Sequence, residues 1–218
     1  MKRKIKKWMF RITFLVIISI VTIVLTILNP GMLYANKTVD GNFTVYHEEA
    51  LHPDIESQLG NAHELVSASE IYDEEFKIKV CLNDGALYPY LIEKLFGRAF
   101  GWGGYNLSVF YGVANYADNY TEINKYKWNL EQLFAHELTH CYQANYFGLF
   151  NSNPVADYPT WKWEGYAEYV ARKGEDQQDL VKMITRYKKS VGENANAWEV
   201  EFVDGTIAPR SYYEYWML

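Results

Sequence analysis

The stretch AHELTH at 135–140 constrains the fold more than any other, because its two histidines can act together only on a helix. A helix turns about 100° per residue, so His136 and His140 differ by about 40° in direction and lie one turn apart. Glu137 falls on the same flank. We therefore predict a helix over 130–147, with its boundaries and its other face set by the residues around the motif.

Those surrounding residues agree with a helix. Asn129 is a good N-cap, Gln132 stands where a capping-box partner would, and Gly148 suits the position after the last turn. The flank opposite the histidines is apolar and is predicted to pack on a sheet; its residues are Leu130, Phe134, Leu138 and Cys141.

The letters AHEL also occur at 62–65, where Val66 and Ser67 follow. Ser67 stands where a second histidine would be needed. We interpret this copy as part of an ordinary helix opened by Pro53, with His63 facing solvent or packing locally.

Two histidines at i and i+4 can hold one Zn²⁺, while the glutamate between them reaches a reacting water without binding the ion. Glu164, 24 residues after His140 in WKWEGYAEY, is the candidate third ligand. Three protein ligands leave one position open, as in catalytic zinc sites. Glu168, one turn further, is placed to accept the spare ring N–H of a ligand histidine. The alternatives are a solvated helix and a solvated acidic pair.

The N-terminal region differs from the rest. Six cations in the first eleven residues precede a run of 17 uncharged residues, 12–28, and a mediocre cleavage site ends at Ala35. This pattern is typical of a signal peptide or of a signal anchor, and the sequence leaves both open. In either case the basic flank is predicted to stay in the cytoplasm and the remainder to lie outside. We divide the chain into this segment, 1–35, and one domain, 36–218.

The charge and the cysteines limit the other classes of function. Without residues 1–35 the chain keeps 15 cations against 27 acidic residues, a net charge of −12. That charge argues against nucleic acid or anionic lipid as a partner of the domain. Cys81 and Cys141 allow one disulfide, but two buried free thiols are the preferred interpretation.

Hydrophobic patterns predict an α+β domain. Strands are expected at 42–46, 76–82 and 106–113, with a glycine-rich link (Gly101, Gly103 and Gly104) before the last. Helices are expected at 54–69, at 88–96, from Thr160 to near Gly174, and from Asp176 to Gly192. The last helix should place Leu180, Ile184, Tyr187 and Val191 inward. The end of the chain should form a strand in WEVEFV and a short helix in SYYEYWML.

HELTH followed by WxxEGxAEY resembles the gluzincin metallopeptidases, and most closely the small peptidase-MA-like domains. The resemblance extends from Asn42 to the end of the chain. It implies a zincin-like core: a small mixed sheet packed on the HExxH helix, with helices following. His136, His140 and Glu164 then match the zinc ligands, Glu137 the general base, and Glu168 the carboxylate behind a ligand histidine. Trp161 matches a packing aromatic of the family.

The resemblance further implies one Zn²⁺ per chain and hydrolysis of a peptide or protein substrate. The substrate would lie extended beside an edge strand, here 106–113. Family members usually continue into a larger helical region that often supplies a Tyr or His to stabilise the oxyanion. The candidates in this sequence are Tyr212, Tyr213 and Tyr215.

We therefore expect an exported zinc peptidase, either secreted or held to the membrane through residues 12–28. The alternative is a membrane-tethered, peptidase-like binding or assembly domain without turnover, favoured by the short C-terminal region and the 17% aromatic content. A purely structural zinc domain fits less well, because three ligands leave the coordination open.

Overall fold

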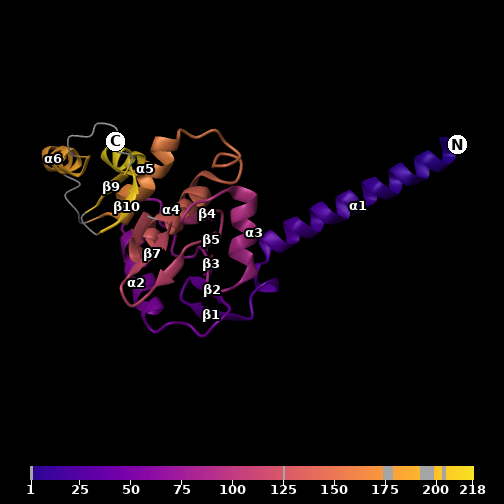
Figure 1. Ribbon diagram of the computed structural model, residues 1–218, viewed down its shortest axis with the longest axis horizontal. Helices are drawn as coiled ribbons and strands as arrows, with labels where there is room; N and C mark the ends of the chain where they lie inside the picture. Colours follow the sequence, from indigo (N-terminus) through magenta and orange to yellow (C-terminus); the bar gives the residue numbers. More distant parts are fainter. Residues whose placement is uncertain (1, 125, 174–178, 192–198, 203–204) are drawn as a thin grey trace.

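The computed structural model describes residues 2–124, 126–173, 179–191, 199–202 and 205–218, and these form a domain with one projecting helix (Figure 1). The α+β class is confirmed: the described residues contain seven α-helices and two five-stranded sheets. The predicted helix start at Asp176, and the predicted helix ends at Gly174 and Gly192, fall outside the described residues.

The first sheet is mixed and has helices on both faces. β2 runs parallel to β3 and β3 parallel to β5, whereas β1 and β4 are antiparallel at the two edges. Alternating side chains such as Phe43 and Val45 face α2 and α4, while Leu107 and Val109 face α3. In sheet order the strands are β1 (Asn36–Asp40), β2 (Phe43–His47), β3 (Ile78–Cys81), β5 (Leu107–Phe110) and β4 (Gly101–Gly104).

The second sheet is antiparallel and was not predicted as a sheet, although the strand expected in WEVEFV is present in it as β9. It brings the end of the chain back beside the start of α4, where β10 pairs with β8. Its strands, in sheet order, are β6 (Val113–Asn115), β7 (Tyr120–Ile123), β8 (Tyr126–Asn129), β10 (Ile207–Pro209) and β9 (Glu199–Glu201).

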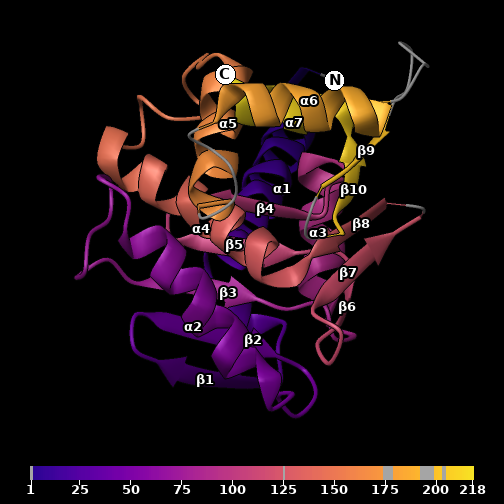
Figure 2. The same ribbon diagram turned by 90° about the vertical axis from the view of Figure 1, so that its left-hand side faces the viewer.

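The helix α4 lies at the centre of the domain, between the two sheets, α2 and α5 (Figure 2). Every residue from Leu133 to Ala144 is buried, so the helix has no solvated face over three turns. Its predicted bounds are confirmed. The helices of the domain are α2 (Asp54–Ser67), α3 (Leu87–Phe96), α4 (Leu130–Phe147), α5 (Thr160–Ala171), α6 (Leu180–Val191) and α7 (Arg210–Met217).

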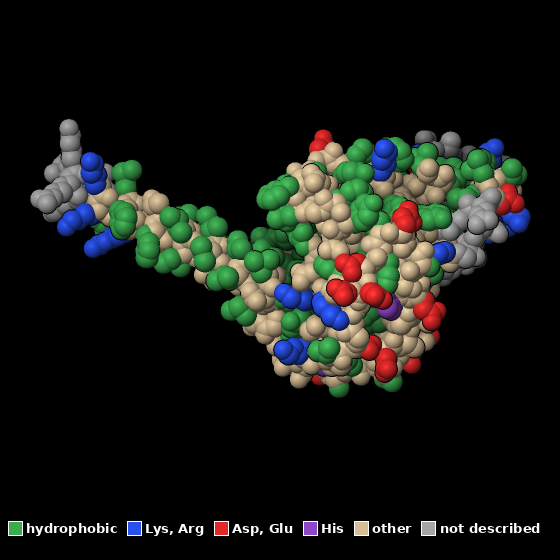
Figure 3. Space-filling view, turned by 180° about the vertical axis from the view of Figure 1, so that it is seen from behind, with side chains coloured by type: hydrophobic (Ala, Val, Ile, Leu, Met, Phe, Trp, Pro, Cys, Tyr) green, Lys and Arg blue, Asp and Glu red, His purple; other side chains and the backbone are tan. Residues whose placement is uncertain are grey.

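The projecting helix α1 (Lys2–Leu28) contains the uncharged run. Its segment Lys6–Leu28 is long and apolar enough to cross a membrane, and a signal sequence has the same properties. Figure 3 shows apolar side chains around this helix and basic ones near its free end. Both interpretations of the N-terminus therefore remain open.

Two of the predicted elements were wrong, and a third, α6, is present with Tyr187 packed on the core as predicted but with part of its predicted inner face wrong. The glycine-rich link is itself a strand, β4, because glycines allow a close backbone approach that the pattern of large side chains does not signal. The segment 106–113 is not one edge strand: β5 lies inside the first sheet, and Val113 begins β6 in the second. In α6, Leu180 and Ile184 are exposed, and Met183 is buried instead. The side chain of Val191 lies outside the described residues.

The two cysteines are free and buried, as preferred. Cys81 is the last residue of β3 and packs in the apolar cluster between the sheet and α3. Cys141 lies on α4, with its Sγ 3.4 Å from the carbonyl oxygen of Leu107. Burial raises the pKa of both thiols, so both stay protonated at neutral pH.

Candidate metal centre

The first turn of α4 is held by more than its own cap. Asn129 Oδ1 accepts a hydrogen bond from the backbone N–H of Gln132 at 3.1 Å, as predicted. The reciprocal bond of a capping box is absent between these residues, because the Asn129 N–H donates to Thr206 Oγ1 at 3.0 Å. The Gln132 side chain instead accepts from Arg172. The start of α4 is thus tied to α5 and to the β9–β10 region.

His136, His140 and Glu164 converge on one point. The two Nε2 atoms are 3.1 Å apart, and Glu164 Oε2 lies 3.3 Å from His136 Nε2 and 3.5 Å from His140 Nε2. Both histidines are almost fully buried, while the Glu164 side chain is 23% exposed and forms the open side. The solvated-helix interpretation is therefore excluded for these residues.

The neighbours of each ring fix its tautomer. His136 Nδ1 lies 2.9 Å from Glu168 Oε1, and His140 Nδ1 lies 2.7 Å from Gln143 Oε1. The Gln143 amide is itself oriented, because its Nε2 donates to the Trp163 carbonyl at 3.0 Å. In the neutral form of each ring the proton is therefore held on Nδ1, and the lone pair that could bind a metal is on Nε2, facing the shared point.

Glu168 acts through a buried chain that returns to α4. Its Oε2 accepts from Arg172 Nε at 2.7 Å, and Arg172 Nη1 donates to Gln132 Oε1 at 2.6 Å. Both Glu168 and Arg172 are almost inaccessible to solvent. Burial raises the pKa of Glu168, but Arg172 and His136 outweigh it and lower the pKa, so the carboxylate stays ionised. Glu168 is therefore not a solvated acid.

The three donors fit a zinc ion. A tetrahedral zinc with ligand bonds of 2.0–2.1 Å sets its ligand atoms about 3.3–3.4 Å apart, close to the 3.1, 3.3 and 3.5 Å found here. Among the described residues, these three alone form a group of metal-ligand type within reach of one ion. Two lone pairs and a carboxylate oxygen at this spacing repel one another unless a metal ion or a proton lies between them.

The electrostatics point the same way. Burial lowers the pKa of His136, but the carboxylates of Glu164 and Glu168 outweigh burial and raise it to about 10. Burial raises the pKa of Glu164, whereas the two histidines lower it well below its usual range. The point where the three side chains meet is therefore strongly attractive to positive charge.

Glu137 lies beneath the edge strand β4. A Cβ on Gly101 would come within 2.8 Å of Glu137 Oε1, and a Cβ on Gly103 within 2.1 Å of the Glu137 carbonyl oxygen. The strand can cross the helix this closely only because both residues are glycine. Burial raises the pKa of Glu137, which suits a group that must take up a proton.

A cavity of about 230 Å³ opens onto these groups. Trp163 stacks on the His140 ring, with the ring centroids 5.6 Å apart and an interplanar angle of 4°. Trp128 contacts the His136 ring edge-on, with the ring centroids 5.7 Å apart. These rings immobilise the imidazoles and exclude water from their flanks. The remaining walls come from β4 and from the α4–α5 connection, and include Phe100, Trp102, Asn153 and Pro154.

The three candidate tyrosines have different positions. Tyr212 lines the metal cavity, with its ring 6.1 Å from that of His136. Tyr213 is a core residue packed on Phe202 and Trp216, and Tyr215 lines a different cavity. Burial and the carboxylates of the site raise the pKa of Tyr212 well above its usual value, so its hydroxyl remains a donor.

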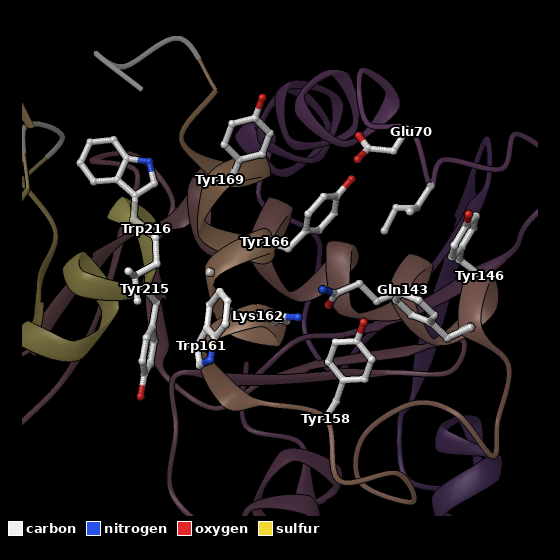
Figure 4. A pocket seen from close by; sticks show the side chains of 14 residues that line it. Glu70, Gln143, Tyr146, Tyr158, Trp161, Lys162, Tyr166, Tyr169, Tyr215 and Trp216 are labelled. Atoms are coloured by element: carbon white, nitrogen blue, oxygen red, sulfur yellow. The ribbon is translucent and has the colours of Figure 1, made fainter. Parts of the chain in front are cut away.

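The second cavity lies on the other side of α5 and measures about 470 Å³. Figure 4 shows that its walls are mainly aromatic, with Gln143 and Lys162 among them. Trp161, the predicted packing aromatic, lies here and is 44% exposed. Gln143 also contacts His140, which lines the metal cavity, so this one side chain links the two cavities.

Several residues of the site were missed in the sequence. Gln143 and Arg172 each follow a recognised residue by one helical turn, His140 and Glu168 respectively, so helix periodicity alone could have found them. Trp163 immediately precedes Glu164, and Trp128 immediately precedes the N-cap Asn129. The glycines of β4 carried no such signal, because only the fold brings them over α4.

Comparison of the chain with known protein families, with curated proteins and with solved structures finds no match.

Proposed function

We propose that this protein is an exported zinc-dependent peptidase, with a gluzincin-type site on a zincin-like core. The observation that carries the proposal is the convergence of His136 Nε2, His140 Nε2 and Glu164 Oε2 at 3.1–3.5 Å. They meet beside a buried acid, Glu137, in a cavity that opens to solvent. A structural zinc site would be closed by a fourth ligand.

Each residue has a definite part in this proposal. His136, His140 and Glu164 hold the ion, while Glu168 and Gln143 keep the two rings in the ligating tautomer. A bound zinc supplies a Lewis acid that polarises the scissile carbonyl and makes water more acidic. Glu137 takes the proton from the attacking water and passes it to the leaving amine nitrogen. Tyr212 donates a hydrogen bond to the carbonyl oxygen as negative charge develops there.

We infer the position of the substrate from that of β4. This strand is the last of its sheet in the described residues and runs directly above Glu137. A peptide that adds to the sheet beside β4 would lie extended over the metal, with side chains alternating between the cavity and solvent. β4 therefore takes the part first expected of 106–113.

The test is metal analysis of the full chain purified in detergent, combined with digestion of a peptide library. We expect about one zinc per chain and peptide cleavage that disappears in Glu137→Gln with the zinc retained. Tyr212→Phe should lower kcat more than it raises KM, because the bond forms mainly in the transition state. Zinc-loaded protein that leaves the library intact, with no difference between wild type and Glu137→Gln, rules out the peptidase.

The second candidate is a membrane-tethered binding or assembly domain without turnover. The observation in its favour is the aromatic cavity of about 470 Å³ bordered by Gln143, which has the size and composition of a ligand site. On this proposal zinc binds but partner binding is unchanged in Glu137→Gln, so the same variant separates the two candidates.

A further inference from the structure

The end of α1 is fastened to the domain by side chains of the first sheet and α3. The last carbonyls of a helix have no partner within it. Here Lys79 Nζ donates to the Leu28 carbonyl at 2.8 Å, and the Tyr88 hydroxyl donates to the carbonyl of Ile27. Ile27 also packs against the apolar cluster between α3 and the sheet. The direction of α1 is therefore set relative to the domain, unlike that of a helix on a loose tether.

Exposed apolar side chains gather on the face from which α1 leaves. They come from the end of α3 and from the connection between α4 and α5, which lie on the α1 side of the domain in Figure 1 and on opposite sides of α1 in Figure 2. Their exposed fractions lie between 45 and 78%. We call the following residues the apolar rim: Leu95, Phe96, Leu149, Phe150 and Val155.

The charge distribution matches this gathering. Residues 148–156, GLFNSNPVA, carry no charge, and residues 94–104 carry two cations and no acid. The whole domain, by contrast, has a net charge of −12. In Figure 3 the surface next to α1 shows apolar and basic side chains, and the acidic ones lie farther from it. The rim thus carries no acidic group, and its two cations, Lys94 and Arg98, have long side chains that can keep their charges in water.

The apolar rim adjoins the metal cavity directly. Phe96 stacks on Trp102 with ring centroids 4.8 Å apart, and Trp102 lines that cavity. On the other side, Asn153 and Pro154 line the cavity between Leu149 and Val155 in the same connection. Both segments that carry the rim therefore also carry the cavity walls.

We propose that the apolar rim inserts into the interface of the bilayer that α1 crosses, so that the metal cavity receives polypeptide segments lying at that surface. The inference rests on α1 remaining in the membrane and on the proposed peptidase activity. Its substrate class is the stretch of another membrane protein next to its own membrane span.

The length of the apolar run supports this arrangement. The run ends at Leu28, so Leu28 marks one boundary of the hydrocarbon layer. Figure 1 places α3 and the α4–α5 connection, the segments that carry the rim, near the level of that end of α1. Phenylalanine, leucine and valine at this depth transfer apolar surface out of water, which is how interfacial segments bind. Because the attraction is apolar, neutral lipid should suffice and salt should change it little.

The contact is tested with spin labels on the full chain in phosphatidylcholine vesicles. Phe150→Cys reports from the rim, and Val113→Cys, 73% exposed on β6, is the matched control; the native cysteines are buried. We expect the label at 150 to gain collisions with oxygen and lose those with a water-soluble nickel chelate, and the label at 113 to show the aqueous pattern. Equal, aqueous behaviour of both labels overturns the proposal.

The substrate class is tested by presenting one cleavable peptide either free in solution or anchored to the same vesicles. The rim variant Leu149→Ser/Phe150→Ser should cut the free peptide like wild type, and the anchored peptide at least about tenfold more slowly than wild type does. Equal rates on the anchored peptide overturn the assignment. If wild type cuts neither peptide, the peptidase fails, while the label experiment still decides the membrane contact.

Discussion

The two AHEL segments share four letters and a helical conformation, and they differ in what surrounds them. Ala62 and Ala135 are both fully buried, so each helix packs by the same small residue. On α2, His63 bonds to the Tyr72 hydroxyl at 2.9 Å, and Glu64 is exposed. On α4, His136 and Glu137 are both buried and face a second helix and a strand. The local sequence is thus enough to form a helix in both places, but only on α4 do the packed elements bring further functional side chains to the histidine and the glutamate.

The largest expected difference concerns metal binding. His136→Ala removes one of three ligands, so zinc should fall from about one per chain to near zero after dialysis. His63→Ala removes only a contact with Tyr72 and should keep full zinc content. The measurement is elemental analysis of both purified variants. Equal loss in the two would mean that zinc is bound elsewhere or nonspecifically.

The next difference concerns the two glutamates. Glu137→Gln should slow peptide cleavage by about 10²–10⁴-fold, the usual contribution of a general base, without loss of zinc. Glu64→Gln changes the same atom in the same four-residue context on an exposed site, and its rate should match wild type. The measurement is the steady-state rate of cleavage of one library-derived peptide by each variant. Similar rates for Glu137→Gln and Glu64→Gln would mean that Glu137 is not the general base.

A smaller effect is expected for two buried glutamines. Gln143→Ala leaves His140 Nδ1 without its acceptor, so zinc affinity should fall by about 10–100-fold. Gln58 on α2 is also buried, with its Nε2 donating to the Tyr116 carbonyl at 2.6 Å. Gln58→Ala should lower the free energy of unfolding about as much as Gln143→Ala does, because each removes a buried hydrogen bond. Gln58→Ala should nevertheless leave zinc affinity unchanged. Competition with a chromogenic chelator measures both, and unaltered affinity in Gln143→Ala would contradict the tautomer argument.

The smallest effect is expected at a glycine on α2. Nothing lies within 4 Å of a Cβ on Gly60, so Gly60→Ala should raise the free energy of unfolding by about 0.5–1 kcal/mol. At Gly103 the sign reverses: Gly103→Ala meets the backbone of α4 and should cost about 1–3 kcal/mol or more. Urea denaturation of both variants measures this, and a neutral Gly103→Ala would mean that β4 does not press on the helix.

The sequence was most informative where the chemistry lies within one helix. The bounds of α4, the flank of His136 and His140, and the step from Glu164 to Glu168 all follow from a period of 3.6 residues. The sequence did not reveal contacts between elements distant along the chain. Gly101 and Gly103 lack side chains and so lack a pattern, and β10 reaches β8 only after the chain has passed through α4, α5 and α6. Which tyrosine faces the cavity depended on the same return, since Tyr212 to Tyr215 differ only by rotation about α7.

The buried chain from His136 through Glu168 and Arg172 to Gln132 has a consequence for protein engineering. A peptide copied from α4 alone would carry both histidines and none of the groups that orient His136. The smallest unit that could be grafted into another scaffold is the α4–α5 pair, with Arg172 included. The guanidinium carbon of Arg172 also lies 3.5 Å from the centroid of the Phe202 ring. A graft of the α4–α5 pair must therefore include an aromatic side chain at this position as well.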